Sequence, residues 1–254
     1  MSSSAVSGDG YEVHTHETVH RAYEAVFQNL QSVVERAWLP FVLVLAVEIV
    51  GMAIGGGGEA GHLLSWMLGA LAFLIFGTTF AVHWFRHLLL GEAASGELFP
   101  RAWRPLFFAA LTITLLVFAG GIVVALIGMV TKPLAFLIWA VGSILVALAA
   151  LRVLPMLPAA AVERPIDVRG AWEMLAGNYW HYIACALICY VPFALIEGLL
   201  AEADSGAGFV LWAIIEVIRI GVTFLGLACL YAMLADVYHG LTGIGRRPAV
   251  SAAA

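Results

Sequence analysis

Six runs of apolar residues, each long enough to cross a membrane as a helix, constrain this chain more than any other feature of its sequence. A bilayer core about 30 Å thick is crossed by about 20 residues in helical form. Lipid offers no hydrogen-bond partners, so a spanning segment must pair its backbone groups internally, as a helix does. The predicted spans lie near residues 38–56, 63–85, 106–130, 133–157, 181–201 and 209–235.

The composition fits a chain surrounded mostly by lipid. Hydrophobic residues make up 63% of the sequence and charged residues 11%, whereas soluble domains carry about 25% charged residues. The mean hydropathy is +0.98. A net charge of −5 gives no reason to expect a nucleic-acid partner. The three cysteines, Cys185, Cys189 and Cys229, lie in apolar runs, which predicts buried free thiols. The fold class is therefore predicted to be an all-α polytopic membrane helix bundle.

Three short turn-like segments each lie between the two spans of a pair. They are GGGGEAGH at Gly55–His62, TKP at Thr131–Pro133 and EADSGAG at Glu202–Gly208. Glycine is conformationally loose and proline lacks an amide donor, so both tend to end helices. Length also requires the break at TKP, because one straight helix across it would be far too long for the membrane. The six spans are thus predicted to form three hairpins.

Basic residues are distributed unevenly between the two sides that six spans create. Lys132 falls in a loop on one side, and Arg219 lies within a span. The other side, which holds the termini, carries Arg21, Arg36, Arg86, Arg101, Arg104, Arg152, Arg164, Arg169, Arg246 and Arg247. Tryptophans predicted at the interface on that side are Trp38, Trp84, Trp103, Trp172 and Trp180. Because cytoplasmic loops are rich in Lys and Arg, both termini are predicted to be cytoplasmic. His83, Arg86 and His87 are expected to contact lipid headgroups there.

A short motif occurs twice, each time just ahead of or at the start of an apolar run. RAWLP at Arg36–Pro40 is repeated as RAWRP at Arg101–Pro105. Arginine can meet headgroups, tryptophan prefers the interface, and proline is tolerated in the first helical turn. The motif fits either an internal duplication or a chance recurrence. Amphipathic lead-in helices along the membrane surface are predicted near residues 17–36, 92–103 and 167–178.

Several features together resemble a known group of proteins. They are the six-span layout, WFRHLLLGE after the second span, and LPMLPAAAVERP followed by AWEML. The chain resembles bacterial integral membrane proteins of the YciC type and the membrane domain attached to some glycerophosphodiester phosphodiesterases. The likeness covers most of residues 20–240 and includes no catalytic motif. It implies a multi-pass fold in the bacterial inner membrane and transfers no activity.

Charged residues inside the apolar runs are the first candidate site. In LWAIIEVIRIG, Glu216 and Arg219 are three residues apart and share one face of a helix. A charge in mid-membrane costs about 2.5–3.5 kcal/mol on insertion scales, so such residues usually face the bundle and find partners. At the helical rise, Glu48 lies about 14 Å into the first span and Arg219 about 10 Å from the opposite side. Because these depths are measured from opposite sides of a core about 30 Å thick, the two residues differ in level by only a few ångströms. This predicts that Glu48 and Arg219 pair, with Glu197 near enough to join them.

Two interpretations of this cluster remain. The favoured one is a buried pair that joins the first and last spans and fixes their register. The alternative is a pathway for protons or cations, because Glu48, Glu197 and Glu216 outnumber the single Arg219. Glu197 could instead extend outward to the interface, which would remove the excess of acid.

HETVH at His16–His20 is the second candidate. It matches H-E-x-x-H, in which two histidines one helical turn apart bind zinc and the glutamate activates water. It precedes the first span in a polar segment, with His14 as its nearest further ligand, and lacks the rigid surroundings that a catalytic site needs. A chance match is favoured, so His16, Glu17 and His20 are only a weak metal candidate, and no cofactor is expected.

The sequence predicts a disordered tail at 1–16, a membrane domain at 17–240 and a flexible tail at 241–254. The leading functional interpretation is a non-enzymatic structural or accessory protein, acting in lipid organisation or on a partner. A small-solute or proton-coupled transporter using Glu48, Glu216 and Arg219 is the alternative, and a membrane zinc protease comes third.

Overall fold

The structure, a computed structural model, describes residues 12–55, 59–131, 134–204 and 209–245. These residues form helices and connecting loops, with no strand among them. The helices are α1 (Thr15–Phe27), α2 (Leu30–Gly55), α3 (Glu59–Leu90), α4 (Trp103–Val130), α5 (Ala135–Val153), α6 (Met156–Ala161), α7 (Val168–Met174), α8 (Tyr179–Asp204) and α9 (Phe209–Thr242). Most of the two predicted terminal tails lies outside the described residues.

Six of these segments are long and apolar enough to cross a membrane. They run over Leu30–Ile54, Leu63–Leu90, Trp103–Val130, Phe136–Ala161, Tyr179–Ala203 and Val210–Thr242. Each one contains most of a predicted span, and α2 with α3, α4 with α5, and α8 with α9 are the most extensive helix pairs. The prediction of an all-α, multi-pass membrane protein built from three hairpins is therefore confirmed.

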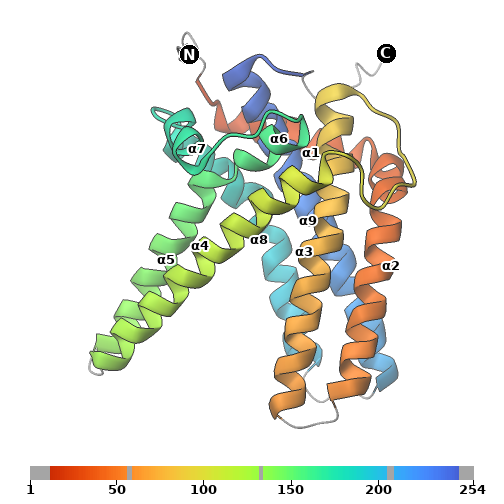
Figure 1. Ribbon diagram of the computed structural model, residues 1–254, viewed down its shortest axis with the longest axis vertical. Coiled ribbons are helices and arrows are strands. Elements are labelled where there is room, and N and C mark those ends of the chain that lie inside the picture. The colour runs from red at the N-terminus through yellow and green to blue at the C-terminus, as the bar shows by residue number, and fades with distance from the viewer. Residues whose placement is uncertain (1–11, 56–58, 132–133, 205–208, 246–254) are drawn as a thin grey trace.

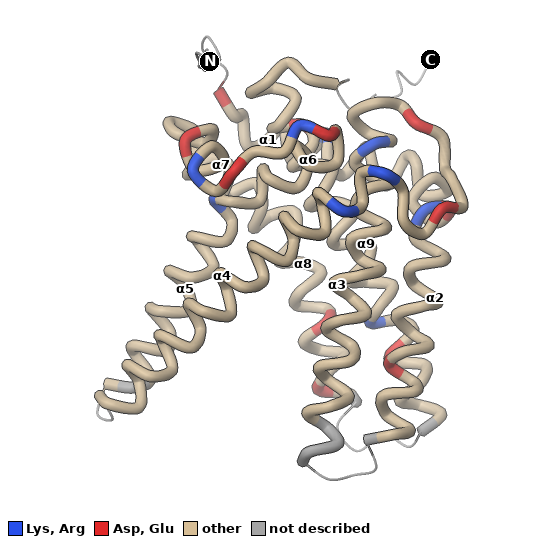
Figure 2. The backbone as a smooth tube through the Cα atoms, in the orientation of Figure 1, with Lys and Arg blue, Asp and Glu red and all other residues tan. Residues whose placement is uncertain are grey.

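One end of the molecule is closed by short helices. Figure 1 shows α1, α6, α7 and the loop between α3 and α4 together at this end, which also holds the first and last described residues. We call it the capped end and the opposite end the open end. Figure 2 shows basic residues concentrated at the capped end, as the uneven distribution of arginines predicts.

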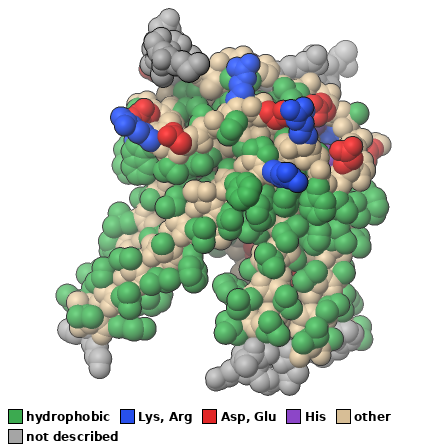
Figure 3. Space-filling view, viewed as in Figure 1, with side chains coloured by type: hydrophobic (Ala, Val, Ile, Leu, Met, Phe, Trp, Pro, Cys, Tyr) green, Lys and Arg blue, Asp and Glu red, His purple; other side chains and the backbone are tan. Residues whose placement is uncertain are grey.

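Below the capped end the helices separate into two arms. The four-helix arm consists of α2, α3, α8 and α9, and the hairpin arm consists of α4 and α5. The hairpin arm slants away from the other helices toward the open end (Figure 1). Its contacts with the remainder come from α4 against α3 and α6, and from α5 against α7 and α8. The space-filling view shows an open gap between the arms, bordered by hydrophobic side chains (Figure 3).

Exposure along the hairpin arm shows how little of it is covered by protein. All residues from Thr114 to Ala119 on α4 are exposed. Successive residues of an α-helix are about 100° apart, so this run samples the whole circumference. On α5 the partly covered positions recur at Ile138, Gly142, Val146 and Ala150, one per turn, on the side of α4. At this level the hairpin arm is therefore exposed on the side of the gap as well as on its outer side.

Small residues explain how α4 and α5 stay together with so little other support. A Cβ atom added to Gly120 would lie 2.7 Å from Cγ2 of Val146, and one added to Gly142 would lie 2.6 Å from Cγ2 of Val124. Both distances are shorter than van der Waals contact, so only glycine fits without a shift. Close approach at small residues is the usual way in which membrane helices associate.

The best-packed part of the molecule lies at the capped end. Every residue of α6 is buried, and so is the run from Ala232 to Tyr238 on α9, which makes α9 the central helix there. Trp84 is fully buried on α3, and its Nε1 donates to the carbonyl of Ala228 at 3.0 Å. Placing Trp84 at the lipid interface was therefore wrong. An indole N–H can be buried if it finds an acceptor, and the backbone of α9 supplies one.

The predicted lead-in helices are only partly as expected. α1 covers Thr15–Phe27, but residues 30–36 already belong to α2, and α7 covers Val168–Met174. Residues 91–97 form no helix, so the lead-in predicted at 92–103 is wrong. This segment lies along α3, whose side chains form hydrogen bonds with its backbone carbonyls. These bonds replace those that a helix would supply.

The two copies of the RAW-x-P motif have different surroundings. RAWRP ends in the first turn of α4, where Pro105 leaves no amide unpaired. RAWLP lies inside α2, so Pro40 is within the helix rather than at its start. Arg36 is 6% exposed, whereas the side chain of Arg101 is 90% exposed. The two copies thus do not occupy equivalent structural positions.

Candidate functional site

The charges of α9 are paired within the helix. Nε and Nη2 of Arg219 donate to the two carboxylate oxygens of Glu216 at 2.8 and 2.6 Å. Residues three apart in a helix lie on one face, which permits this two-pronged contact. Glu216 is 3% exposed, while the side chain of Arg219 is 40% exposed. The pair therefore carries its acid into the bundle and leaves its base closer to the surface.

Glu48 approaches this pair from α2. It lies close enough to Glu216 and Arg219 to interact electrostatically with both. Its carboxylate rests against Gly69 of α3, where an added Cβ would collide with Oε1. The absence of a side chain at Gly69 thus creates the space that Glu48 fills. The structure brings the three charged residues together at the meeting of α2, α3 and α9, and direct pairing of Glu48 with Arg219 remains a prediction.

Glu197 is placed differently. It is partly buried on α8, and its Oε1 has no hydrogen-bond partner among the described residues. Its electrostatic neighbour is Tyr190, two turns earlier on the same helix. The structure does not show Glu197 joining the other three charges, so its part in the cluster stays a prediction.

The HETVH motif lies at the start of α1. The His16 and His20 rings stack with centroids 6.3 Å apart, Glu17 pairs with Arg21 at 3.3 Å and His20 with Glu24 at 3.3 Å. Over the described ranges, no three His, Cys, Asp or Glu side chains gather closely enough to hold a metal ion. The motif borders a cavity of about 540 Å³ at the capped end, whose polar lining includes Glu12, His14, His16, Glu17, Asn178 and His181.

An ion pair that was not predicted from the sequence attaches α1 to the bundle. Arg21 donates from Nε and Nη2 to the carboxylate of Asp236 on α9, at 2.9 to 3.2 Å. Asp236 is 1% exposed and the Arg21 side chain 20%. A buried carboxylate needs such a partner. The available signal was an aspartate near the inner end of the last apolar run.

Other contacts of α1 continue the attachment. Tyr23 donates its hydroxyl hydrogen to the carbonyl of Ile188 on α8 at 2.9 Å. Burial, with the nearby Cys189 and Cys229 thiols as smaller causes, raises the pKa of Tyr23 to about 12, so the donor stays protonated at physiological pH. Val13 N–H donates to Asn178 at 2.9 Å. α1 is thus packed on α8 and α9 rather than lying free on the membrane surface. The three cysteines are buried free thiols, as predicted.

The loop between α3 and α4 determines where the hairpin arm begins. His83 contacts the carbonyl of Glu97 at 2.8 Å, and Thr79 donates to that of Leu98 at 2.9 Å. Arg86 binds the Glu92 carboxylate at 2.6 and 2.7 Å. The loop therefore follows α3 back toward the membrane before α4 starts. Side chains expected to contact headgroups instead hold this loop.

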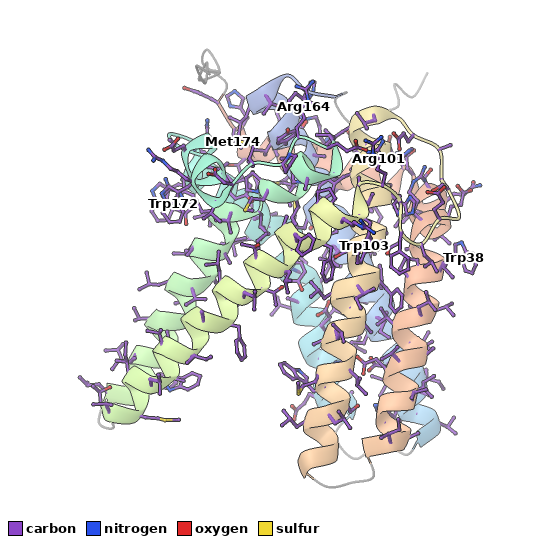
Figure 4. The ribbon with its side chains drawn as sticks, in the orientation of Figure 1. Trp38, Arg101, Trp103, Arg164, Trp172 and Met174 are labelled. Atoms are coloured by element: carbon purple, nitrogen blue, oxygen red, sulfur yellow. The ribbon has the colours of Figure 1, made fainter. Side chains whose placement is uncertain are left out.

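α4 starts at the point where the two arms separate. Trp103 donates from Nε1 to the carbonyl of Ile75 on α3 at 3.3 Å, and its ring stacks on Phe107 at 4.7 Å. Figure 4 labels Trp103 beside the crossing of α4 and α3, with Arg101 nearby. Arg104 follows Trp103 and is exposed. Basic side chains are seen above the gap in Figure 3. We call the surface around Arg101, Trp103 and Arg104 the head of the gap.

The chain was compared with known protein families, curated proteins and solved structures, and it matches none of them. The resemblance to YciC-type proteins and to phosphodiesterase membrane domains therefore stays a prediction.

Proposed function

We propose that this protein is a non-enzymatic integral protein of the bacterial inner membrane that organises lipid, by admitting lipid chains between its two arms. The observation that carries this proposal is that every residue of α4 from Thr114 to Ala119 is exposed. In a membrane, an apolar helix surface without a protein neighbour is covered by lipid chains. The side of α4 toward the gap would thus contact lipid inside the outline of the molecule.

The remaining site residues support a structural role for the four-helix arm. Glu216 and Arg219 neutralise each other within α9, and Glu48 fills the space over Gly69. Such contacts hold α2, α3 and α9 together, so that one arm is firm while the hairpin arm stands apart. The termini are placed in the cytoplasm by the positive-inside rule, with the capped end on that side.

The proposal is tested by measuring what surrounds α4. Single cysteines at Leu115, Leu116, Val117 and Phe118, in a chain whose native cysteines are replaced by alanine, carry a spin label in lipid nanodiscs. Together these positions sample one full turn. We expect all four labels to collide frequently with oxygen, which dissolves in lipid, and rarely with a water-soluble nickel chelate. A matched lipid-facing control is Ile144 on α5, which is 58% exposed.

Other results would contradict the proposal in distinguishable ways. Frequent collision with the nickel chelate at any of the four positions would mean a water-filled gap, and would favour the transporter alternative that uses Glu48, Glu216 and Arg219. Low collision with both reagents at one position would mean that protein covers that side of α4. Either outcome rejects lipid chains as the content of the gap.

A further inference from the structure

We infer that the head of the gap binds the headgroup of an anionic phospholipid, through Arg101 and Arg104 at the start of α4. This inference rests on the proposed function, because it identifies which lipid class the gap selects. The supporting observations begin with the charges at the head of the gap. The side chain of Arg101 is 90% exposed and reaches Glu163 only at 3.8 Å. Arg104 is exposed and has no ion pair with any residue that the structure describes.

Three other basic residues at the capped end differ in this respect. Arg86 is held by Glu92 and Glu163, and Arg21 by Asp236. The guanidinium carbon of Arg152 lies over the rings of Trp172 and Tyr179, at 4.1 and 4.6 Å from their centroids. These guanidinium groups are already engaged by protein. Arg101 and Arg104 are available to a phosphate, for which an arginine supplies a matching planar pair of donors.

The surface below Arg104 fits a lipid tail. Phe108, Leu115 and Ile122 lie four, eleven and eighteen residues after Arg104, which places all of them within about 40° of one line along the helix. Their exposed fractions are 62%, 56% and 45%. The helical rise puts Leu115 about 17 Å beyond Arg104, close to the thickness of about 15 Å for one leaflet of the hydrocarbon core. A cation at the start of an apolar stripe, whose first part to Leu115 is about as long as one leaflet, complements one phospholipid.

Aromatic side chains fix the depth of this site. Trp103 lies between Phe99 and Phe107, with ring centroids 4.9 and 4.7 Å away. Tryptophan prefers the level of the lipid headgroups, and the hydrogen bond of Trp103 to Ile75 attaches it to α3. The start of α4 is therefore held at headgroup depth on the four-helix arm, where a lipid phosphate would meet the two arginines.

The test measures lipid selectivity in membranes that contain the protein. Spin-labelled phosphatidylglycerol and phosphatidylcholine report the fraction of each lipid whose motion the protein restricts. We expect a preference for phosphatidylglycerol of roughly fivefold for each arginine near the surface, weakening as salt rises. The Arg101→Gln, Arg104→Gln double variant should lose most of this preference. Arg104→Lys, which keeps the charge, should retain much of it.

A matched control changes two other exposed arginines at the same end, Arg164→Gln with Arg169→Gln. An equal loss of preference in this control would mean a general surface potential and would overturn the inference, as would an unchanged preference in the Arg101, Arg104 variant. The total number of restricted lipids, together with the oxygen collision of labels at Leu115 to Phe118, reports the gap itself. If the number of restricted lipids and the oxygen collision both remain high while lipid selectivity is absent, the headgroup site is rejected and the proposed function stands. If both quantities are low, the proposed function is rejected as well.

Discussion

Ion pairs at two depths show how single residues stabilise this molecule. Glu216 and Arg219 are three residues apart in sequence and pair inside one membrane helix, whereas Arg21 and Asp236 are separated by most of the chain and pair at the capped end. In both pairs the acid is nearly inaccessible, at 3% and 1% exposure. Removing the base from either would leave a buried carboxylate without its partner, which costs far more than the pair itself contributes.

Arg219→Leu is expected to destabilise the protein by about 3–5 kcal/mol, because Glu216 would lose its partner inside the bundle. Adding Glu216→Gln should recover most of the loss. Thermal unfolding in detergent measures both. Glu48→Gln, made alone and together with Arg219→Leu, then completes a double-mutant cycle for the predicted pairing of α2 with α9. If the effects of Glu48→Gln and Arg219→Leu simply add, the two side chains are not coupled and that pairing is wrong.

The purified protein is expected to contain no stoichiometric zinc at HETVH. His20 and Glu17 each contact a neighbour on the same helix, Glu24 and Arg21 respectively, and a zinc site needs at least three converging protein ligands. Elemental analysis decides the point. One zinc per chain that disappears in His16→Ala would restore the protease interpretation.

At the scale of helices, the α1 contacts decide how the capped end is closed. α1 joins α9 through Arg21 and α8 through Tyr23, so it belongs to the bundle although it lies outside the spans. The hairpin arm shows the opposite behaviour. α4 and α5 pack on each other at Gly120 and Gly142, and other helices support them mainly in the turns nearest the capped end. One short helix is therefore firmly attached, while two long ones stand apart.

Arg21→Gln is expected to loosen α1. The buried Asp236 would lose a two-pronged partner, so local opening of α1 should become easier by about 3–5 kcal/mol. Hydrogen exchange of the α1 amides measures the change. Glu17→Gln is the matched control, because it removes only an exposed pair worth about 0.3–0.5 kcal/mol. Asp236→Asn combined with Arg21→Gln should restore much of the protection. Equal exchange in Arg21→Gln and the control would show that this ion pair does not hold α1.

The whole molecule is closed by short helices at the capped end and separated into two arms toward the open end, and its basic residues are distributed unevenly between these two ends. Basic residues gather at the capped end (Figure 2), while the arms carry exposed apolar side chains toward the open end (Figure 3). This shape would displace more lipid on the capped side than on the open side.

Both termini are expected in the cytoplasm. A reporter that is active only in the periplasm should be silent at the C-terminus and active when inserted in the Gly55–His62 loop, while a cytoplasmic reporter should show the reverse. The physical reason is the retention of Lys and Arg on the cytoplasmic side during insertion. An active periplasmic reporter at the C-terminus would invert the topology and place the arginines of the headgroup site in the other leaflet.

The sequence by itself determined the features that depend on local chemistry. Apolar runs about 20 residues long specify spanning helices because lipid cannot pair backbone groups, and the breaks at glycine and proline specify three hairpins. The in-helix contact of Glu216 with Arg219 also follows from their spacing. These inferences hold because each needs only the residues of one segment and the solvent around it.

Only the tertiary structure decided how those segments meet. It placed Trp84 in the core against Ala228, put Glu48 against Gly69 and joined Arg21 to Asp236. It also separated the hairpin arm from the rest. Every apolar run looks equally suited to lipid or to another helix, because lipid chains and aliphatic side chains are equally apolar. Which neighbour each helix has is therefore decided by packing at small residues and by a few buried polar contacts between distant parts of the chain.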